Sequence, residues 1–288
     1  MDRVVLRRIV CAVDLSERSV PSLKQALQLA RLHRSELLVV HVAEQWDART
    51  ESARRKVTDA FLTLRRHVVR ETLTAPVRWI VAHGNPAIEL ARFIRRTNAD
   101  LAVVGAVLPS SSAGVVGSVA HAIVRSTACP VLVLPRTLEN DASPKPYRTI
   151  ICGVSSGLST ATLRYALSFA QEFESRLTIL NTAFDRVRGA DHNWVTSDID
   201  RLRAEIPNDA HDWCLIDELV TSGEPAEELV KATRRLESDL VVVGSTGASE
   251  SEGGLGSVAL GALMLTNASV LIVPTRGTAR EIDKTMAA

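Results

Sequence analysis

Aromatic residues are scarce in this chain: Phe, Trp and Tyr together make up 4% of its 288 residues, although 46% of the residues are hydrophobic. The core must therefore consist of Val, Leu, Ile and Ala, a composition that suits parallel strands covered by helices on both faces. No apolar run approaches the roughly 20 residues that a membrane-spanning helix needs. The charged segment 1–8 leads directly into a strand-like run and lacks the pattern of a secretory signal. These absences predict a cytoplasmic protein without a membrane partner.

Cysteine is also rare, and its spacing is uninformative. The four cysteines, Cys11, Cys129, Cys152 and Cys214, form no CxxC pair. Cys11 and Cys152 lie within apolar strand-like runs, where a reduced thiol behaves as a small hydrophobic group. A disulfide framework is therefore not expected, which fits a reducing compartment.

The usual catalytic motifs are missing as well. The chain has no GxxxxGK[ST] phosphate loop and no GxSxG nucleophile elbow. After the first strand, where a dinucleotide-binding protein carries GxGxxG, the sequence is Val13-Asp14-Leu15-Ser16. We expect a binding or regulatory protein and not an enzyme, with slow ATP hydrolysis left open.

Two weaker patterns have simpler explanations. His211 and Cys214 could supply two metal ligands, but no second pair of similar spacing accompanies them. The basic clusters at 54–56 and 65–66 fall on an expected amphipathic helix, where a solvated face is the default. Because aromatic residues do not accompany these clusters, nucleic acid is not an expected partner.

The strongest positive signal is an internal duplication. Six blocks recur in the same order at a spacing of 139 to 141 residues. The blocks of the first copy are 8–14, 23–27, 84–87, 100–105, 117–120 and 130–135, and those of the second are 149–155, 163–167, 223–226, 239–244, 256–259 and 269–274. We expect two domains, 1–138 and 147–276, joined by the polar segment 139–146.

Each copy reads as alternating strands and helices. In the first copy the strands are expected near 7–13, 36–42, 77–82, 101–104 and 130–134, all short and rich in β-branched residues. Ser19 and Asn85 are expected helix caps, with Pro21 and Pro86 in the first turns. The pattern predicts an α/β fold: two flavodoxin-like or Rossmann-like domains, each a five-stranded parallel sheet with helices on both faces. In the second copy the helix between 184 and 212 should be shorter, because Gly, Asp, Asn and Pro interrupt it.

Ligands of open parallel sheets bind outside the carboxyl ends of the strands, where the strand order reverses. The first strand of copy one ends at Asp14, and each fourth strand ends in Gly, at Gly105 and Gly244. A Gly-Ser pair, 117–118 and 256–257, then opens the next helix. Such a helix start offers N–H groups and a positive dipole end to an anion. The alternative is that the glycines only permit a tight turn and that Ser257 is a helix cap.

Together these blocks resemble the universal stress protein family. The first-strand Asp, the second strand ending near Val42, the GxPA block and the GSVA block followed by an apolar fifth strand carry the resemblance, which covers nearly the whole chain twice. The resemblance implies a stress-response role and, for one branch of the family, ATP bound by a Gly-x2-Gly-x9-Gly-[Ser/Thr] loop. Another branch lacks this loop and binds no nucleotide.

Neither copy follows the nucleotide-binding pattern fully. Copy one has Asp14, but Leu108 replaces the second loop glycine. Copy two keeps the loop residues but has Ser155 at the Asp position and a spacer of eight residues, which includes Glu250 and Glu252. These carboxylates could repel a polyphosphate or help to hold Mg²⁺. We expect the second copy to bind ATP or ADP weakly and the first copy not to hold phosphates.

The candidate nucleotide-binding residues all lie at strand ends or helix starts. They are Asp14, Val42, Gly105, Gly117, Ser118, Ser155, Val243, Gly244, Gly247, Gly256, Ser257 and Val258. The alternative function is a stress protein that acts through protein–protein contacts without nucleotide. By the same resemblance, the fifth strands (131–134 and 270–273) are expected to pair the two copies as an internal pseudo-dimer, and association of whole chains into a homodimer stays open.

Charge is distributed unevenly between the copies. Residues 1–138 contain 20 Lys and Arg against 11 Asp and Glu, a balance of +9, and the remainder carries −8, for a net charge of +1. Two solvated surfaces that diverged after the duplication explain this asymmetry. The alternative is that opposite charge helps the copies to dock or gives them different partners.

Overall fold

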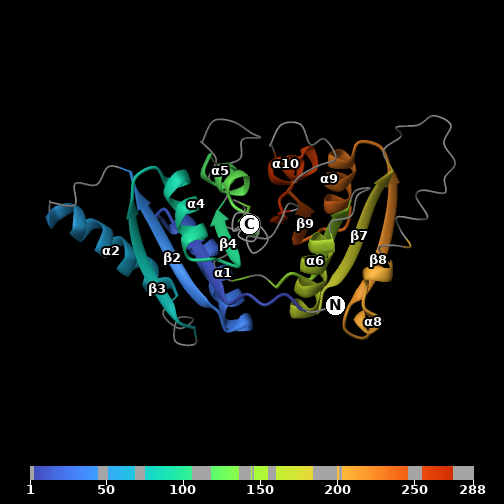
Figure 1. Ribbon diagram of the computed structural model, residues 1–288, viewed down its shortest axis with the longest axis horizontal. Helices are drawn as coiled ribbons and strands as arrows, with labels where there is room; N and C mark the ends of the chain where they lie inside the picture. The colour runs from blue at the N-terminus through green and yellow to red at the C-terminus, as the bar shows by residue number, and fades with distance from the viewer. Residues whose placement is uncertain are drawn as a thin grey trace, which may run out of the picture. The chain divides into compact units, whose positions relative to one another are not determined.

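The computed structural model describes residues 3–44, 51–68, 75–105, 118–135, 144, 146–154, 160–183, 200, 203–245 and 255–274. The chain divides into two compact units: Val5–Lys145, and Met1–Val4 together with Pro146–Ala288. Each unit holds one copy of the duplicated sequence and is called a repeat below (Figure 1). The residues Arg3 and Val4 group with the second repeat, although they precede the first.

The first repeat alternates strands and helices. Its elements are β1 (Arg8–Ala12), the 3-10 turn η1 (Glu17–Ser19), α1 (Val20–His33), β2 (Glu36–Ala43), α2 (Glu51–His67), β3 (Val77–His83), α4 (Pro86–Arg96), β4 (Leu101–Gly105), α5 (Ser118–Ser126) and β5 (Val131–Leu134). The five expected strands are confirmed, with ends that differ from the prediction by one residue at most.

The second repeat has the same plan. Its elements are β6 (Thr149–Val154), α6 (Thr160–Phe173), β7 (Arg176–Ala183), α8 (Ala210–Trp213), β8 (Leu215–Ser222), α9 (Pro225–Arg235), β9 (Leu240–Gly244), α10 (Ser257–Leu265) and β10 (Ser269–Val273). Before β8, residues 200 and 203–205 are helical and the short helix α8 follows, while residues 184–199 and 201–202 lie outside the described part, so the expected shorter helix stays a prediction.

Both sheets are parallel and have the same strand order. The order is β3-β2-β1-β4-β5 in the first repeat and β8-β7-β6-β9-β10 in the second. The chain moves outward from β1 through β2 to β3 and then crosses to β4 on the other side, so the order reverses at β1 and, equally, at β6. This is the doubly wound arrangement that the alternating pattern predicts.

The central strands are covered on both faces. Ile9, Val10 and Cys11 of β1 are at most 1% exposed, and consecutive strand residues point to opposite faces of a sheet. β4 and β5 are buried in the same continuous way. Aliphatic residues can fill such strands without aromatic side chains, which explains the low aromatic content. Helices α4 and α5 pack side by side, as do α9 and α10 (Figure 1).

An aspartate at the start of the fourth strand ties it to the first strand in both repeats. Asp100 Oδ2 accepts the backbone N–H groups of Arg7 and Arg8, both at 2.8 Å. Asp239 Oδ2 accepts those of Arg148 and Thr149 at 2.9 and 3.0 Å. The duplicated Asp is therefore explained by the fold: it accepts the backbone N–H groups at the start of β1 and β6.

The two expected helix caps have different outcomes. Asn85 Oδ1 accepts the N–H groups of Ala87 and Ile88, so this cap is confirmed. Ser19 stands at the N-cap position of α1 but makes no capping bond, because it has αR backbone geometry at the end of η1. Its hydroxyl bonds instead to Asp14. The Ser19 prediction was therefore wrong in mechanism.

Within the described residues, no helix is both long and apolar enough to cross a bilayer. All four cysteines are free and buried. Burial raises the pKa of the Cys11 and Cys152 thiols to about 12, so both remain protonated at neutral pH. They act as small apolar residues in β1 and β6, as the sequence predicts.

Candidate functional site

The strand register brings the candidate residues of the first repeat to one edge of its sheet. Ala12 pairs with Val40 and Cys11 with Val103. Continuing these parallel registers places Asp14 beside Val42 and places Gly105 beside the end of β1. The expected convergence of strand ends at the reversal point is thus present in the first repeat.

Asp14 is engaged by its own loop. Its Oδ1 accepts the Ser16 N–H at 2.9 Å, the Ser16 hydroxyl at 2.7 Å and the Ser19 hydroxyl at 2.6 Å. The Asp14 N–H in turn donates to Ser19 Oγ at 2.9 Å. Partial burial raises the pKa of Asp14, but hydrogen bonds from Ser19 and Ser16 outweigh it, and the pKa lies below its usual value. The carboxylate is charged at neutral pH and orders the turn before α1.

The residue after Asp14 has an unusual backbone. Leu15 has a φ of 65°, in the left-handed region that a residue with a Cβ rarely occupies. The Asp14–Ser16–Ser19 network surrounds this residue and compensates for its local cost. Sequence reasoning identified Asp14 but missed this network; the Asp-x-Ser spacing is the signal that could have revealed it.

Three aromatic rings, those of His41 in β2, Phe61 in α2 and Trp79 in β3, contact one another. His41 Nδ1 lies 3.0 Å from the carbonyl oxygen of Val13, at the end of the first strand. The His41 ring contacts the ring of Phe61 in α2 edge-on, with 6.3 Å between the ring centroids, and the rings of Phe61 and Trp79 have centroids 5.4 Å apart. His41 is therefore a hydrogen-bonded residue near the end of β2 and not a free ligand group.

In the second repeat the helix start lies at the end of the fourth strand. β9 ends with Val243 and Gly244, and the Ser245 N–H donates to the Val273 carbonyl at 2.8 Å. The Gly256 N–H donates to the Ser245 carbonyl at 3.0 Å. This last bond closes the loop between the two glycines, so the first turn of α10 stands directly beyond β9.

This bond also corrects one expectation about the site. The Gly256 N–H is used within the protein and is not a free donor for a ligand. The groups that lack an intrahelical partner by position are the N–H groups of Ser257, Val258 and Ala259. Ser257 is exposed, and Gly256 rather than Ser257 occupies the cap position.

The electrostatics of the α10 start favour an anion. The first turn contains no acidic side chain, and the helix sequence SVALGALML contains no charge at all. The positive end of the helix dipole is therefore not compensated from within the helix. The first turn of α5 likewise has no acidic residue.

Several predicted residues lie outside the described part of the chain. They are Gly117, Ser155 and Gly247, together with the loop positions Leu108, Glu250 and Glu252. Ser118 is described only as the first residue of α5. Of the described residues, no group of three or more His, Cys, Asp or Glu could hold a metal ion. Cys214 donates its thiol to the Ser175 carbonyl at 3.0 Å and is thereby engaged in the fold.

Two doubly wound parallel repeats in tandem define the class of α/β fold, and comparison with known proteins identifies the family. The sequence profile of the Universal stress protein family matches residues 6–135 and 146–274. Since these two segments cover most of the 288 residues, the chain belongs to the universal stress protein family, with two repeats in tandem.

Individual relatives agree with this placement. Universal stress protein MJ0531 of Methanocaldococcus jannaschii is 23% identical over 142 residues, which cover 45% of this chain and 82% of that protein. The crystal structure of a universal stress protein from Archaeoglobus fulgidus has a TM-score of 0.69 at 15% identity, covering 93% of this chain and 98% of the other. A putative universal stress protein from Pseudomonas aeruginosa has a TM-score of 0.66 at 15% identity, with 98% of each chain covered. At these identities the two structures support the fold.

Proposed function

We propose that this universal stress protein is a cytoplasmic binding or regulatory protein whose second repeat holds an adenine nucleotide, ATP or ADP. The observation that carries the proposal is the 3.0 Å bond from the Gly256 N–H to the Ser245 carbonyl. It holds the start of an uncharged helix at the end of β9, beside the point where the strand order reverses. Phosphate groups are recognised at such helix starts by N–H groups and the helix dipole.

The proposed contacts follow from position. The Ser257 and Val258 N–H groups and the Ser257 hydroxyl would bind phosphate oxygens. Gly244, and Gly247 in the adjoining loop, would allow a close approach of the ligand. Val243 would flank the nucleoside, and Ser155 would replace the acidic residue that contacts it in the nucleotide-binding branch. Because Ser is a weaker acceptor than a carboxylate, we expect modest affinity.

The first repeat lacks this combination. Asp14 is bound to two serines, so a ribose hydroxyl would have to compete with three existing hydrogen bonds. Gly105, Gly117 and Ser118 remain, but Leu108 replaces a loop glycine. We therefore propose that the first repeat does not hold phosphates, and that Val42 has a structural role there.

Two carboxylates precede α10 along the chain, and no catalytic motif accompanies them in the sequence. If Mg²⁺ accompanies the nucleotide, Glu250 and Glu252 are the carboxylates near the proposed phosphate position along the chain. We propose no enzymatic activity beyond slow ATP hydrolysis, since the sequence shows no general base or nucleophile motif.

Isothermal titration with ATP, ADP and AMP, with and without Mg²⁺, tests the proposal. The informative variant is Ser257→Asp, because a carboxylate in the first turn suits the helix dipole and leaves the fold intact but repels phosphate. We expect binding to weaken at least tenfold. The matched control is Ser118→Asp in the first repeat, which should leave binding unchanged. If no nucleotide produces a heat of binding, the proposed nucleotide site is refuted.

The alternative function is protein–protein regulation without nucleotide, and it includes two further proposals. One is that the fifth strands pair the repeats, and the other is that whole chains associate as a homodimer. Leu132 and Leu271 are both fully buried. Charged substitutions at these positions would damage each core and could not report on pairing. Native mass spectrometry of the purified chain tests the homodimer, because it reports oligomeric state and any retained ligand together.

A further inference from the structure

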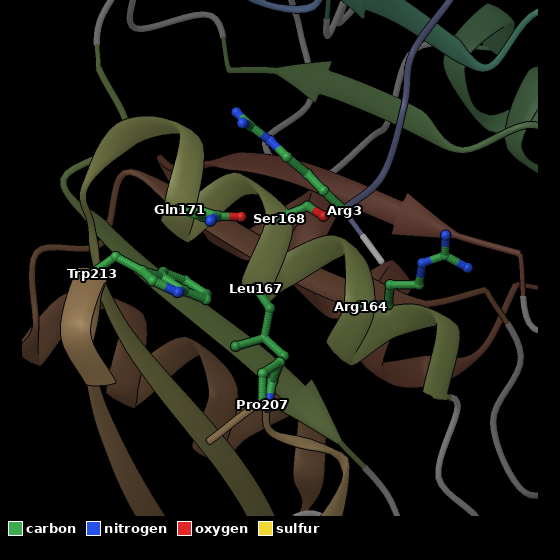
Figure 2. Close-up of a pocket in the computed structure, with 7 residues that line it drawn as sticks. All are labelled: Arg3, Arg164, Leu167, Ser168, Gln171, Pro207 and Trp213. Atoms are coloured by element: carbon green, nitrogen blue, oxygen red, sulfur yellow. The ribbon is translucent and has the colours of Figure 1, made fainter. Parts of the chain in front are cut away.

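The second repeat holds residues from the start of the chain. The Val4 N–H donates to the hydroxyl of Ser168 in α6 at 2.8 Å, and Val4 is only 7% exposed. Arg3 forms an ion pair with Glu172, one helical turn further along α6. Figure 2 shows Arg3 next to Ser168 at a shallow hollow that is also lined by Trp213.

The ion pair joins a buried carboxylate to a long-range partner. The side chain of Glu172 is 4% exposed, while that of Arg3 is 48% exposed. A buried carboxylate is strongly unfavourable unless it is paired. Arg3 supplies the pairing charge from a position 169 residues away in the sequence. Loss of Arg3 would therefore leave a buried charge on α6.

The residues that follow are anchored to the first repeat instead. Leu6 is fully buried, and its carbonyl accepts the hydroxyl of Ser35 at 2.5 Å. The Arg7 N–H donates to Asp100. Only Val5, which is 63% exposed, separates these anchors from those of Val4. The chain thus passes from contacts with the second repeat to contacts with the first repeat across a single residue.

We propose that Arg3 and Val4 form a latch on the second repeat, with the Arg3–Glu172 ion pair as its charged contact. The second repeat is then complete only when the start of the chain is docked on α6. The latch makes the stability of α6 depend on residues that precede the first repeat.

Amide hydrogen exchange of the full chain, followed by NMR, tests the latch. We expect the Val4 amide to exchange at least tenfold more slowly than an unstructured amide, and Ser168→Ala should remove this protection. Arg3→Ala should accelerate exchange across the second half of α6 at least tenfold, because Glu172 is left buried and unpaired. Amides of α1 should not change and serve as the fold check.

The decisive comparison is a rescue. In the Arg3→Ala background, Glu172→Gln removes the unpaired charge and should restore most of the α6 protection. Glu174→Gln, an exposed carboxylate two residues further on, is the matched control and should restore none. An unprotected Val4 amide in the wild-type chain would overturn the proposal. Equal rescue by the two glutamine variants, or no effect of Arg3→Ala, would also overturn it.

Discussion

Replacing Asp239 tests how the fourth strand is tied to the first. Its Oδ2 accepts two backbone N–H groups, those of Arg148 and Thr149. A hydrogen bond to a charged acceptor contributes about 1.5–3 kcal/mol. Because the hydrogen bond from the Arg148 N–H is exposed, we use the low end of this range, about 1.5 kcal/mol, for each of the two bonds. Asp239→Ala should therefore lower the free energy of unfolding by about 3 kcal/mol.

The asparagine variant separates the hydrogen bonds from the charge. In Asp239→Asn the amide oxygen can still accept both N–H groups, so the expected loss is about 1 kcal/mol. Asp100→Ala and Asp100→Asn provide the same pair in the first repeat. Urea unfolding followed by circular dichroism measures all four. If the alanine variants cost less than about 0.5 kcal/mol, or if Asn costs as much as Ala, the two-bond explanation is refuted.

Three further predictions concern local packing, capping and charge. A Cβ on Gly261 would lie 2.9 Å from Ala226 Cβ, so Gly261→Ala should lower the thermal midpoint of unfolding. Adding Ala226→Gly to that variant should recover part of the loss. If the effects of the two substitutions on the midpoint are simply additive, this contact is contradicted. Glu224 makes no side-chain cap, and Glu224→Asn should stabilise α9 by about 0.5–1 kcal/mol in urea unfolding, whereas a loss would show that the Asn does not cap. Ser19→Ala should raise the pKa of Asp14 toward its unfolded value, measured by carboxyl ¹³C titration. Because the folded pKa is depressed, the stability that Asp14 contributes is present above its unfolded pKa and is lost as pH falls through the folded pKa, so the variant should lose less stability in acid. An unchanged pKa would contradict the Ser19 contribution.

The sheet could be predicted from the sequence because its determinants are local and repeated. Short β-branched runs with turn residues between them set the strands, and the duplication gave each strand an independent check. The Asn85 cap followed from an Asn-Pro pair, whose chemistry acts within three residues. The parallel, doubly wound arrangement followed from the alternation of strands and helices, whereas the sequence analysis did not predict the order of the strands.

The site was only partly predictable, because its details depend on which donor reaches which acceptor. Ser19 has the composition of a helix cap, but the loop turns it toward Asp14. Gly256 has the pattern of a ligand donor, but its N–H closes the loop onto Ser245. The contact of Arg3 with Glu172 joins distant residues, and no spacing rule indicates it.

The most direct test of the central claim is an NMR titration of the full chain with ATP. The account predicts that the amide signals of Ser257 and Val258 shift first and most, while those at the start of α5 do not move. Shifts confined to the first repeat, or saturating binding that leaves the Ser257 and Val258 amides unchanged, would contradict a nucleotide site at the start of α10.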